Sequence, residues 1–170
     1  MPPPADSAPR GATRGVPMVL FVITVLLLAA RIGVGLVERG KPHAEAQDLI
    51  RWQTIEAGEA MAREAGRPIL YDFTAEWCGP CKQLEREVFD QQGTAAMIAG
   101  NFVPIRVTDR QREDGRNPPD VARLQARYQV RAFPTLVVVR PDNSVATRIE
   151  GYVGKQQVMT QLMQASLPIH

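Results

Sequence analysis

The sequence has few of the side chains that bind metal ions. Its 170 residues include two cysteines and two histidines, whereas a structural zinc site takes about four nitrogen or sulfur ligands. His43 lies in a polar stretch and His170 is the last residue, both well apart from the cysteines. No histidine follows the second cysteine of CGPCK, so covalent haem attachment is also excluded. We therefore expect no metal ion and no organic cofactor.

An excess of charge is missing as well. Twenty lysines and arginines face 18 aspartates and glutamates, for a net charge of +2, and the two signs are interspersed. Nucleic-acid-binding domains usually cluster their basic residues, so we expect no nucleic-acid partner. The length and the 45% hydrophobic content are those of one globular domain with extensions.

Long apolar runs are confined to one place near the N-terminus. Residues 1–15 are rich in proline, alanine and glycine, which predicts disorder. Residues 16–37 then form an apolar stretch of the length that a spanning helix needs, with Arg31 placed where its side chain can reach the headgroups. Three interpretations compete: a transmembrane anchor, which we favour, a cleaved signal peptide, and a buried core helix.

The orientation of this segment decides where the rest of the chain lies. Basic residues flank it on both sides, so the positive-inside rule discriminates little. An N-terminal apolar segment normally serves as an export signal, and we therefore expect the N-terminus inside. Residues 38–49 would be a linker, and residues 50–167 a domain in the periplasm or an equivalent extracytoplasmic space.

Residues 50–167 alternate between strand-like and helix-like patterns. We expect strands within 50–55, 68–75, 102–108, 135–140 and 145–152, and helices within 56–66, 78–89, 93–99, 118–130 and 155–166. Val158, Leu162 and Met163 should share the apolar face of the last helix. Strands separated by helices, ending in a hairpin and a helix, predict an α/β fold with a mixed central sheet.

Both cysteines stand two residues apart in ILYDFTAEWCGPCKQLE, directly after an apolar strand. A disulfide closing so small a loop would stabilise the fold only weakly, so a redox-active dithiol is the better interpretation. If a helix begins at the motif, its N-terminus favours the thiolate form of Cys78. Cys81 follows one turn later, where it can resolve a mixed disulfide. Gly79 and Pro80 suit the first helical turn.

Three segments resemble thioredoxins. ILYDFTAEWCGPCK resembles their active-site segment, RAFPTLVVV their cis-proline loop, and RIEGYVG their last strand. Together they cover about residues 50–167. The lead-in WQTIEAGEAMAREAGRP and the helix CKQLEREVF are more similar to the C-terminal domain of the transmembrane thiol:disulfide interchange proteins. The resemblance implies a thioredoxin fold.

The resemblance also implies roles for individual residues. Cys78 would be the nucleophile, Cys81 the resolving thiol, and Asp72 the buried carboxylate that helps to move the proton of Cys81. The residues that would contact a substrate are Trp77, Gly79, Pro80, Phe133, the cis-proline Pro134, and Gly151, which would keep the docking surface flat.

The chain departs from thioredoxins at two places. Residues 109–120, DRQREDGRNPPD, form a longer loop than the corresponding one, and we expect the charges of 110–116 to be a solvated loop. In thioredoxins a lysine accompanies the buried aspartate, and FVPIRVT offers no clear counterpart.

These observations predict a membrane-anchored protein-disulfide oxidoreductase that works by thiol–disulfide exchange. Gly-Pro between the cysteines resembles the reducing members of the family, which favours a reductase. Its partners would be protein disulfides and a membrane electron donor. The alternative is a non-catalytic assembly or chaperone module that uses the apolar surface around Trp77 and Pro134.

Overall fold

The structure is a computed structural model that describes residues 49–167 together with Met18, Val22 and Ile23. The chain separates into two units, Met1–Ala46 and Gln47–His170, and the elements described here belong to the second. The expected tail, apolar segment and linker therefore lie, apart from four residues, outside the described part. Within the described part, no helix is long and apolar enough to cross a membrane.

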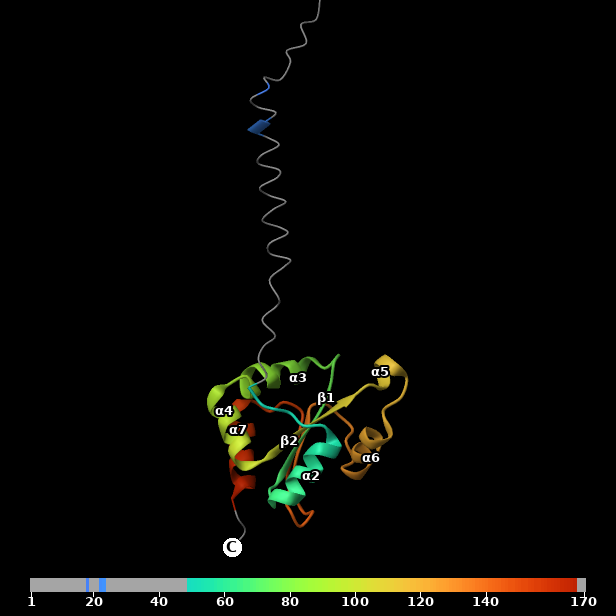
Figure 1. Cartoon of the computed structure of the whole chain (residues 1–170), viewed down its shortest axis with the longest axis vertical. Helices are drawn as coiled ribbons and strands as arrows, with labels where there is room; N and C mark the ends of the chain where they lie inside the picture. The colour runs from blue at the N-terminus through green and yellow to red at the C-terminus, as the bar shows by residue number, and fades with distance from the viewer. Residues whose placement is uncertain (1–17, 19–21, 24–48, 168–170) are drawn as a thin grey trace, which may run out of the picture. The chain divides into compact units, whose positions relative to one another are not determined.

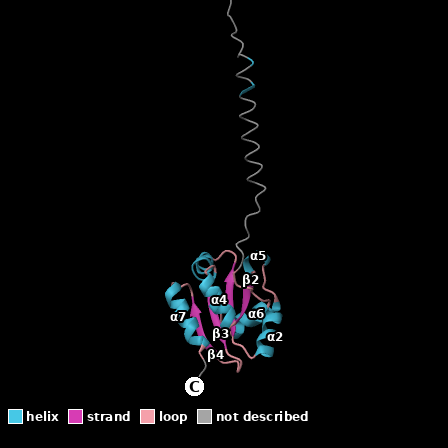
Figure 2. Cartoon of the chain, turned by 60° about the vertical axis from the view of Figure 1, so that its left-hand side comes forward, coloured by secondary structure: helices cyan, strands magenta, loops and turns pink. Residues whose placement is uncertain are grey.

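A four-stranded mixed sheet forms the centre of the second unit, with the strand order β2-β1-β3-β4 (Figure 2). The strands are β1 (Ile69–Ala75), β2 (Val103–Asp109), β3 (Thr135–Val139) and β4 (Val145–Glu150). β1 pairs with β2 in parallel and with β3 in antiparallel direction, and β3 and β4 form an antiparallel hairpin. The mixed α/β sheet predicted from the sequence is confirmed.

Helices cover both faces of this sheet (Figure 1). They are α2 (Ile55–Ala65), α3 (Gly79–Leu84), the π-helical turn η1 (Glu85–Phe89), α4 (Gln92–Asn101), α5 (Gln111–Asp114), α6 (Pro119–Arg127) and α7 (Lys155–Ser166). α3, η1, α4 and α7 enclose one hydrophobic cluster, and α2 and α6 enclose another on the opposite face. Because neighbouring side chains of a strand point to opposite faces, β1 contributes Leu70 to the first cluster and Tyr71 and Phe73 to the second.

Local signals explain most helix boundaries. The side chain of Thr54 accepts a hydrogen bond from the N–H of Ala57 and so caps the start of α2, which ends at Gly66 in the left-handed conformation. Pro118 precedes α6, whose first residue is also a proline. The end of α2 at Gly66 and the start of α6 at its two prolines agree with the expectations from the sequence.

Three expectations need correction. Residues 50–55 do not form a strand, because the chain pairs with β2 only at the Gln53–Ile105 bridge and then turns into α2. On α7 the buried side chains are Val158, Leu162 and Ala165, whereas Met163 is exposed. The loop after β2 contains a short helix, α5, that the pattern of its residues did not predict.

Candidate active site

The two cysteines lie where β1 ends and α3 begins. The N–H of Cys78 donates to the carbonyl of Ala75 over 3.1 Å, which turns the chain out of the strand. Cys78 is the N-cap of α3, and its sulfur accepts a hydrogen bond from the N–H of Cys81 at 3.1 Å. Gly79 and Pro80 form the first turn. The expected helix start is therefore confirmed.

A disulfide joins Cys78 to Cys81, with 5.3 Å between their Cα atoms. Their accessible fractions are only 2% and 7%, while the neighbouring Gly79 and Pro80 are exposed. The pair therefore lies just below the surface, where a partner's sulfur has to approach from one side. Free cysteines are absent from the described residues.

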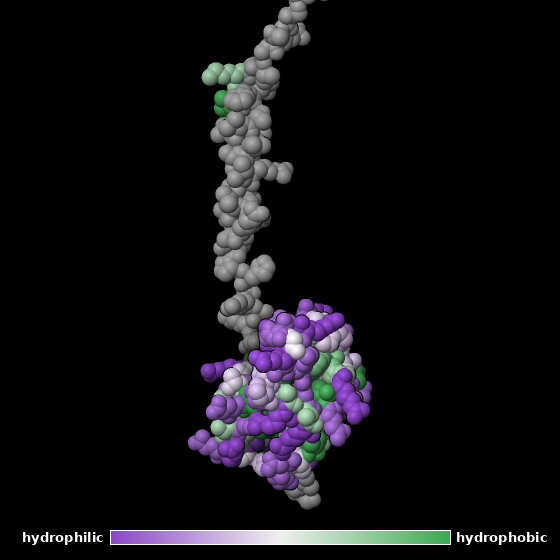
Figure 3. Space-filling view, turned by 90° about the vertical axis from the view of Figure 1, so that its right-hand side faces the viewer, coloured by the Kyte–Doolittle hydropathy of each residue, from purple (hydrophilic) through white to green (hydrophobic). Residues whose placement is uncertain are grey.

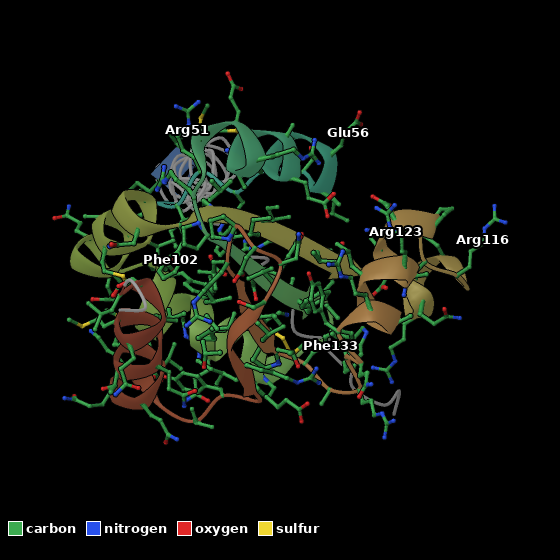
Figure 4. All side chains as sticks on the ribbon, turned by 90° about the horizontal axis from the view of Figure 1, so that it is seen from below. Arg51, Glu56, Phe102, Arg116, Arg123 and Phe133 are labelled. Carbon is green, nitrogen blue, oxygen red and sulfur yellow. A yellow bond between two sulfur atoms is a disulfide. The ribbon has the colours of Figure 1, made fainter. Side chains whose placement is uncertain are left out.

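The loop before β3 packs against the disulfide. The peptide bond between Phe133 and Pro134 is cis, as the resemblance implies, and Phe133 contacts the cluster formed by Ala75 and the two cysteines. Figure 4 shows Phe133 beside the sulfur atoms. Its ring meets that of Trp77 edge to face, with 5.9 Å between the centroids. Trp77 is 46% exposed, which is high for a tryptophan.

Gly151 supports this loop from the end of β4. Its N–H donates to the carbonyl of Pro134 at 2.7 Å, and its φ of 71° lies in the left-handed region that glycine adopts most readily. A Cβ atom at this position would meet nothing within 4 Å. The backbone conformation accounts for a glycine here, and the flat docking surface implied by the resemblance stays a prediction.

Asp72 lies in the middle of β1, opposite Arg106 of β2. It is 2% exposed, and its Oδ2 accepts from Nε of Arg106 at 3.2 Å, while its Oδ1 has no partner within the described part. Burial raises the pKa of Asp72 from 3.8 to about 6, although the Arg106 guanidinium works in the opposite direction. By strand alternation, its side chain shares the sheet face of Leu70, the face that α3 covers.

Arg106 joins Asp72 to the surroundings of Cys81. Its guanidinium also donates to Glu85 at 2.6 Å and stacks over the ring of Trp52, 4.2 Å from the centroid. Arg106, Glu85 and Cys81 line one cavity of about 370 Å³. No hydrogen bond of the described residues joins Asp72 directly to a cysteine. Asp72 itself does not line this cavity, so Arg106 is the member of the buried ion pair that shares it with the resolving sulfur.

FVPIRVT offered no clear lysine to accompany Asp72, and Arg106 takes that place. An arginine inside the otherwise apolar strand FVPIRVT was the available signal, because an arginine is seldom buried without a partner. Pairing β1 with β2 in parallel would then have placed it opposite Asp72. Glu85 was missed for the same reason, since its role depends on Arg106.

The loop after β2 also reaches the site. Arg110 bonds to Glu76 at 2.9 Å, and the guanidinium of Arg112 lies 4.4 Å from the centroid of the Trp77 ring. Glu76 and Trp77 immediately precede Cys78. The loop is therefore in contact with the turn that carries the nucleophile, which the expectation of a merely solvated loop did not include.

Comparisons with known proteins agree with this geometry. A family model described as a thioredoxin-like domain matches residues 55–166. The chain is 30% identical to the thiol:disulfide interchange protein DsbD of Salmonella typhi over 124 residues, which is 69% of the chain and 21% of the relative. It is 31% identical to the thioredoxin of Haemophilus influenzae over 106 residues, covering 62% of the chain and 87% of the relative. The chain thus spans about a fifth of the DsbD proteins that it matches.

Solved structures show the same fold at lower identity. A DsbH oxidoreductase superposes with a TM-score of 0.59 at 17% identity, over 74% of this chain and 90% of that one. The oxidised C-terminal domain of Neisseria meningitidis DsbD gives 0.51 at 24% identity, over 65% and 90%. At these identities the likeness establishes the arrangement of helices and strands.

Proposed function

The chain belongs to the thioredoxin-like family. We propose that it is a thiol–disulfide oxidoreductase and that it works as a membrane-anchored protein-disulfide reductase outside the cytoplasm. One observation supports the site above all: the Cys78–Cys81 disulfide at the N-terminus of α3, packed against the loop of Pro134. A structural disulfide would not need an exposed aromatic side chain and a cis-proline loop beside it.

The reaction begins with the reduced pair. The Cys78 thiolate attacks one sulfur of a target disulfide, forms a mixed disulfide, and releases the target's other sulfur as a thiolate that takes up a proton. Cys81 loses its proton and attacks the sulfur of Cys78. The target leaves as a dithiol, two electrons have moved to it, and the Cys78–Cys81 disulfide remains.

The target would dock on the loop of Phe133 and Pro134. The carbonyl of Pro134 is taken by Gly151, but no hydrogen bond of the described residues engages the backbone of Phe133. An extended target segment can therefore pair with this residue as an added strand. Trp77, Gly79 and Pro80, all exposed, would form the other side of the docking surface.

Asp72 would receive the proton of Cys81. A carboxylate with a pKa of about 6 is mostly ionised at pH 7 and can act as a general base near neutrality. Cys81 and Arg106, the partner of Asp72, line a cavity with room for a water. We expect the proton to pass through water there, because within the described part of the chain no hydrogen bond joins Asp72 to Cys81 directly. Arg106 keeps the carboxylate ionised, because a cation favours the charged form.

The reducing direction rests on the residues between the cysteines. Thioredoxin, with a potential of about −270 mV, is a reductant, whereas a dedicated oxidant such as DsbA is near −120 mV. The Gly-Pro pair resembles that of thioredoxin, the reductant.

A reductase outside the cytoplasm needs an electron source, and a membrane electron donor would supply it. Residues 16–37 would hold the protein at the membrane, which retention through carbonate washing tests.

Serine variants of the two cysteines test the mechanism in the full-length protein. We expect Cys78→Ser to abolish reduction of a protein disulfide, because no nucleophile remains. Cys81→Ser should instead accumulate mixed disulfides, visible as slower bands on a non-reducing gel, because the first attack survives and release does not. Turnover in both variants would contradict the redox mechanism and favour the non-catalytic module.

A further inference from the structure

The loop between β2 and α6, residues 110–117, is held in place by a buried carboxylate at its start. Asp109, which is 7% exposed, accepts hydrogen bonds from Asn117 at 2.5 Å, from Gln125 of α6 at 2.8 Å, and from the N–H of Gln111 at 3.1 Å. Burial pushes the pKa of Asp109 upward, but these hydrogen bonds outweigh burial and keep the pKa below its ordinary value. The two ends of the loop are thus tied to one another and to α6.

The same loop is fastened to the turn that carries the nucleophile. Arg110 bridges its own loop to the active site, since it pairs with Asp114 at 2.6 Å and with Glu76 at 2.9 Å. Arg112 covers the ring of Trp77. α5 accordingly lies at the end of the sheet where α3 begins (Figure 1). The loop has a defined position relative to the disulfide.

A groove of about 620 Å³ runs between this loop and the segment that leads to the cis-proline. Arg116 of the loop and Arg131 of the segment before the cis-proline both line it, and its other lining residues are amides, alanines and a valine. Neither arginine has an ion-pair partner among the residues that the structure describes. The lining residues therefore include two positive charges and no negative one, and the nearby carboxylate of Asp109 is engaged by the amides of Asn117 and Gln125.

The surface around the groove is hydrophilic rather than apolar. Figure 3 views the molecule from the side of α5 and α6 and shows mostly polar residues with scattered hydrophobic ones. Figure 4 shows Arg116 projecting from the tip of the loop. A ligand of this face would thus be recognised by charge. Guanidinium groups bind carboxylates with two parallel hydrogen bonds, which suits a glutamate or aspartate side chain.

We propose that this groove binds acidic residues flanking the reactive cysteine of a target protein, and that residues 110–117 form a specificity element. The inference rests on the proposed function, because Arg131 stands three residues before Pro134. An extended segment that pairs with Phe133 and continues along the loop passes Arg131 and enters the groove. Targets with carboxylates close to their cysteine would then react faster than neutral ones.

Single-turnover reduction of short peptides by the reduced full-length protein tests this inference. Each peptide contains one cysteine in a disulfide with 2-mercaptoethanol. One acidic peptide has two glutamates before the cysteine and another has two after it, and each has a neutral counterpart with glutamines at the same positions. We expect at least one acidic peptide to react about three- to tenfold faster than its neutral counterpart at low salt. The preference should fall toward one at 0.5 M salt, because exposed charges are screened.

Substitutions of the two groove arginines test whether they cause the preference for acidic peptides. In Arg116→Gln/Arg131→Gln the rate ratio of acidic to neutral peptide should fall close to one. Arg123→Gln is the matched control, since Arg123 is an exposed arginine of α6 that does not line the groove, and it should keep the wild-type ratio. Equal rates for all peptides in the wild-type protein would overturn this inference and leave the proposed function standing. Exchange with none of the peptides would overturn the proposed function, and the inference with it.

Discussion

Arg106 and Arg110 each pair with a carboxylate that shortly precedes the redox motif. One of these ion pairs is largely buried and the other is exposed. Arg106 and Asp72 have side chains that are 24% and 3% exposed, whereas those of Arg110 and Glu76 are 40% and 62% exposed. The first pair is largely removed from water, so its charges interact strongly. The same burial raises the pKa of Asp72, although Arg106 opposes the rise. The second remains solvated, and such pairs contribute little to stability.

The comparison shows two different uses of an arginine–carboxylate ion pair. Below the motif, the pair sets the protonation of a carboxylate that can exchange a proton with Cys81. Beside the motif, the pair holds a loop at a fixed place. Substitution should therefore change chemistry and stability at the first site and only substrate choice at the second.

The largest effect is expected from Asp72→Asn. Since the folded chain retains a proton on Asp72 up to a pH of about 6, and the unfolded chain releases it near 4, ionisation costs stability as the pH rises. The wild type should lose roughly 3 kcal/mol relative to the variant between pH 3 and 8. Urea melts of the full-length protein in mild detergent measure this. The rate of disulfide exchange near neutral pH should fall about tenfold in the variant.

Glu76→Gln is the matched control on the exposed side. The carboxylate of Glu76 lies about as far from its arginine as that of Asp72 does from Arg106. Its removal should change neither the pH dependence of stability nor that of the rate. A pH–rate profile that is unchanged in Asp72→Asn would remove Asp72 from the mechanism.

A smaller effect is expected from Arg106→Leu. The variant leaves a buried carboxylate without its cation and should lower the free energy of unfolding by about 2 kcal/mol at pH 7. At pH 5 the loss should be smaller, because Asp72 is then largely neutral and has less need of a partner. Urea melts at the two pH values provide the comparison. An equal loss at both would show that Arg106 stabilises the fold through Glu85 and Trp52 and not through the charge of Asp72.

The smallest effect is expected from Arg110→Leu, the same substitution at the exposed pair. Its melting midpoint should equal that of the wild type within error, because water replaces the contacts that are lost. The emission of Trp77 should respond, since the loop that carries Arg112 loses one attachment. A destabilisation as large as that of Arg106→Leu would contradict the distinction between the two sites.

Much of this arrangement was predictable, because it depends on local signals. Apolar strands, the Gly66 helix end, and the Cys-Gly-Pro-Cys motif at the start of a helix all act through neighbouring residues. The cis-proline at Pro134 followed from the resemblance of RAFPTLVVV. The roles of these residues in exchange stay predictions, although the structure brings Cys78, Cys81, Trp77 and Phe133 together.

What escaped prediction depends on contacts between distant segments. Arg106 meets Asp72 only because β2 pairs with β1 in one register, 34 positions away. The loop after β2 is ordered by Asp109, whose partners include a residue of the following helix. Residues 50–55 have strand-like composition, but the Thr54 cap ends their pairing after one bridge. In the first two cases contacts between distant segments determine the structure, whereas the Thr54 cap is a local signal that outweighs the strand-like composition.

The reduction potential of the Cys78–Cys81 pair is the most direct test of the proposed reductase. Full-length protein is equilibrated in thiol–disulfide buffers of known potential, and free cysteines are alkylated and counted by mass spectrometry. We predict a value close to that of thioredoxin, about −270 mV. A value close to about −120 mV would contradict the account, because the pair would then oxidise its targets instead of reducing them.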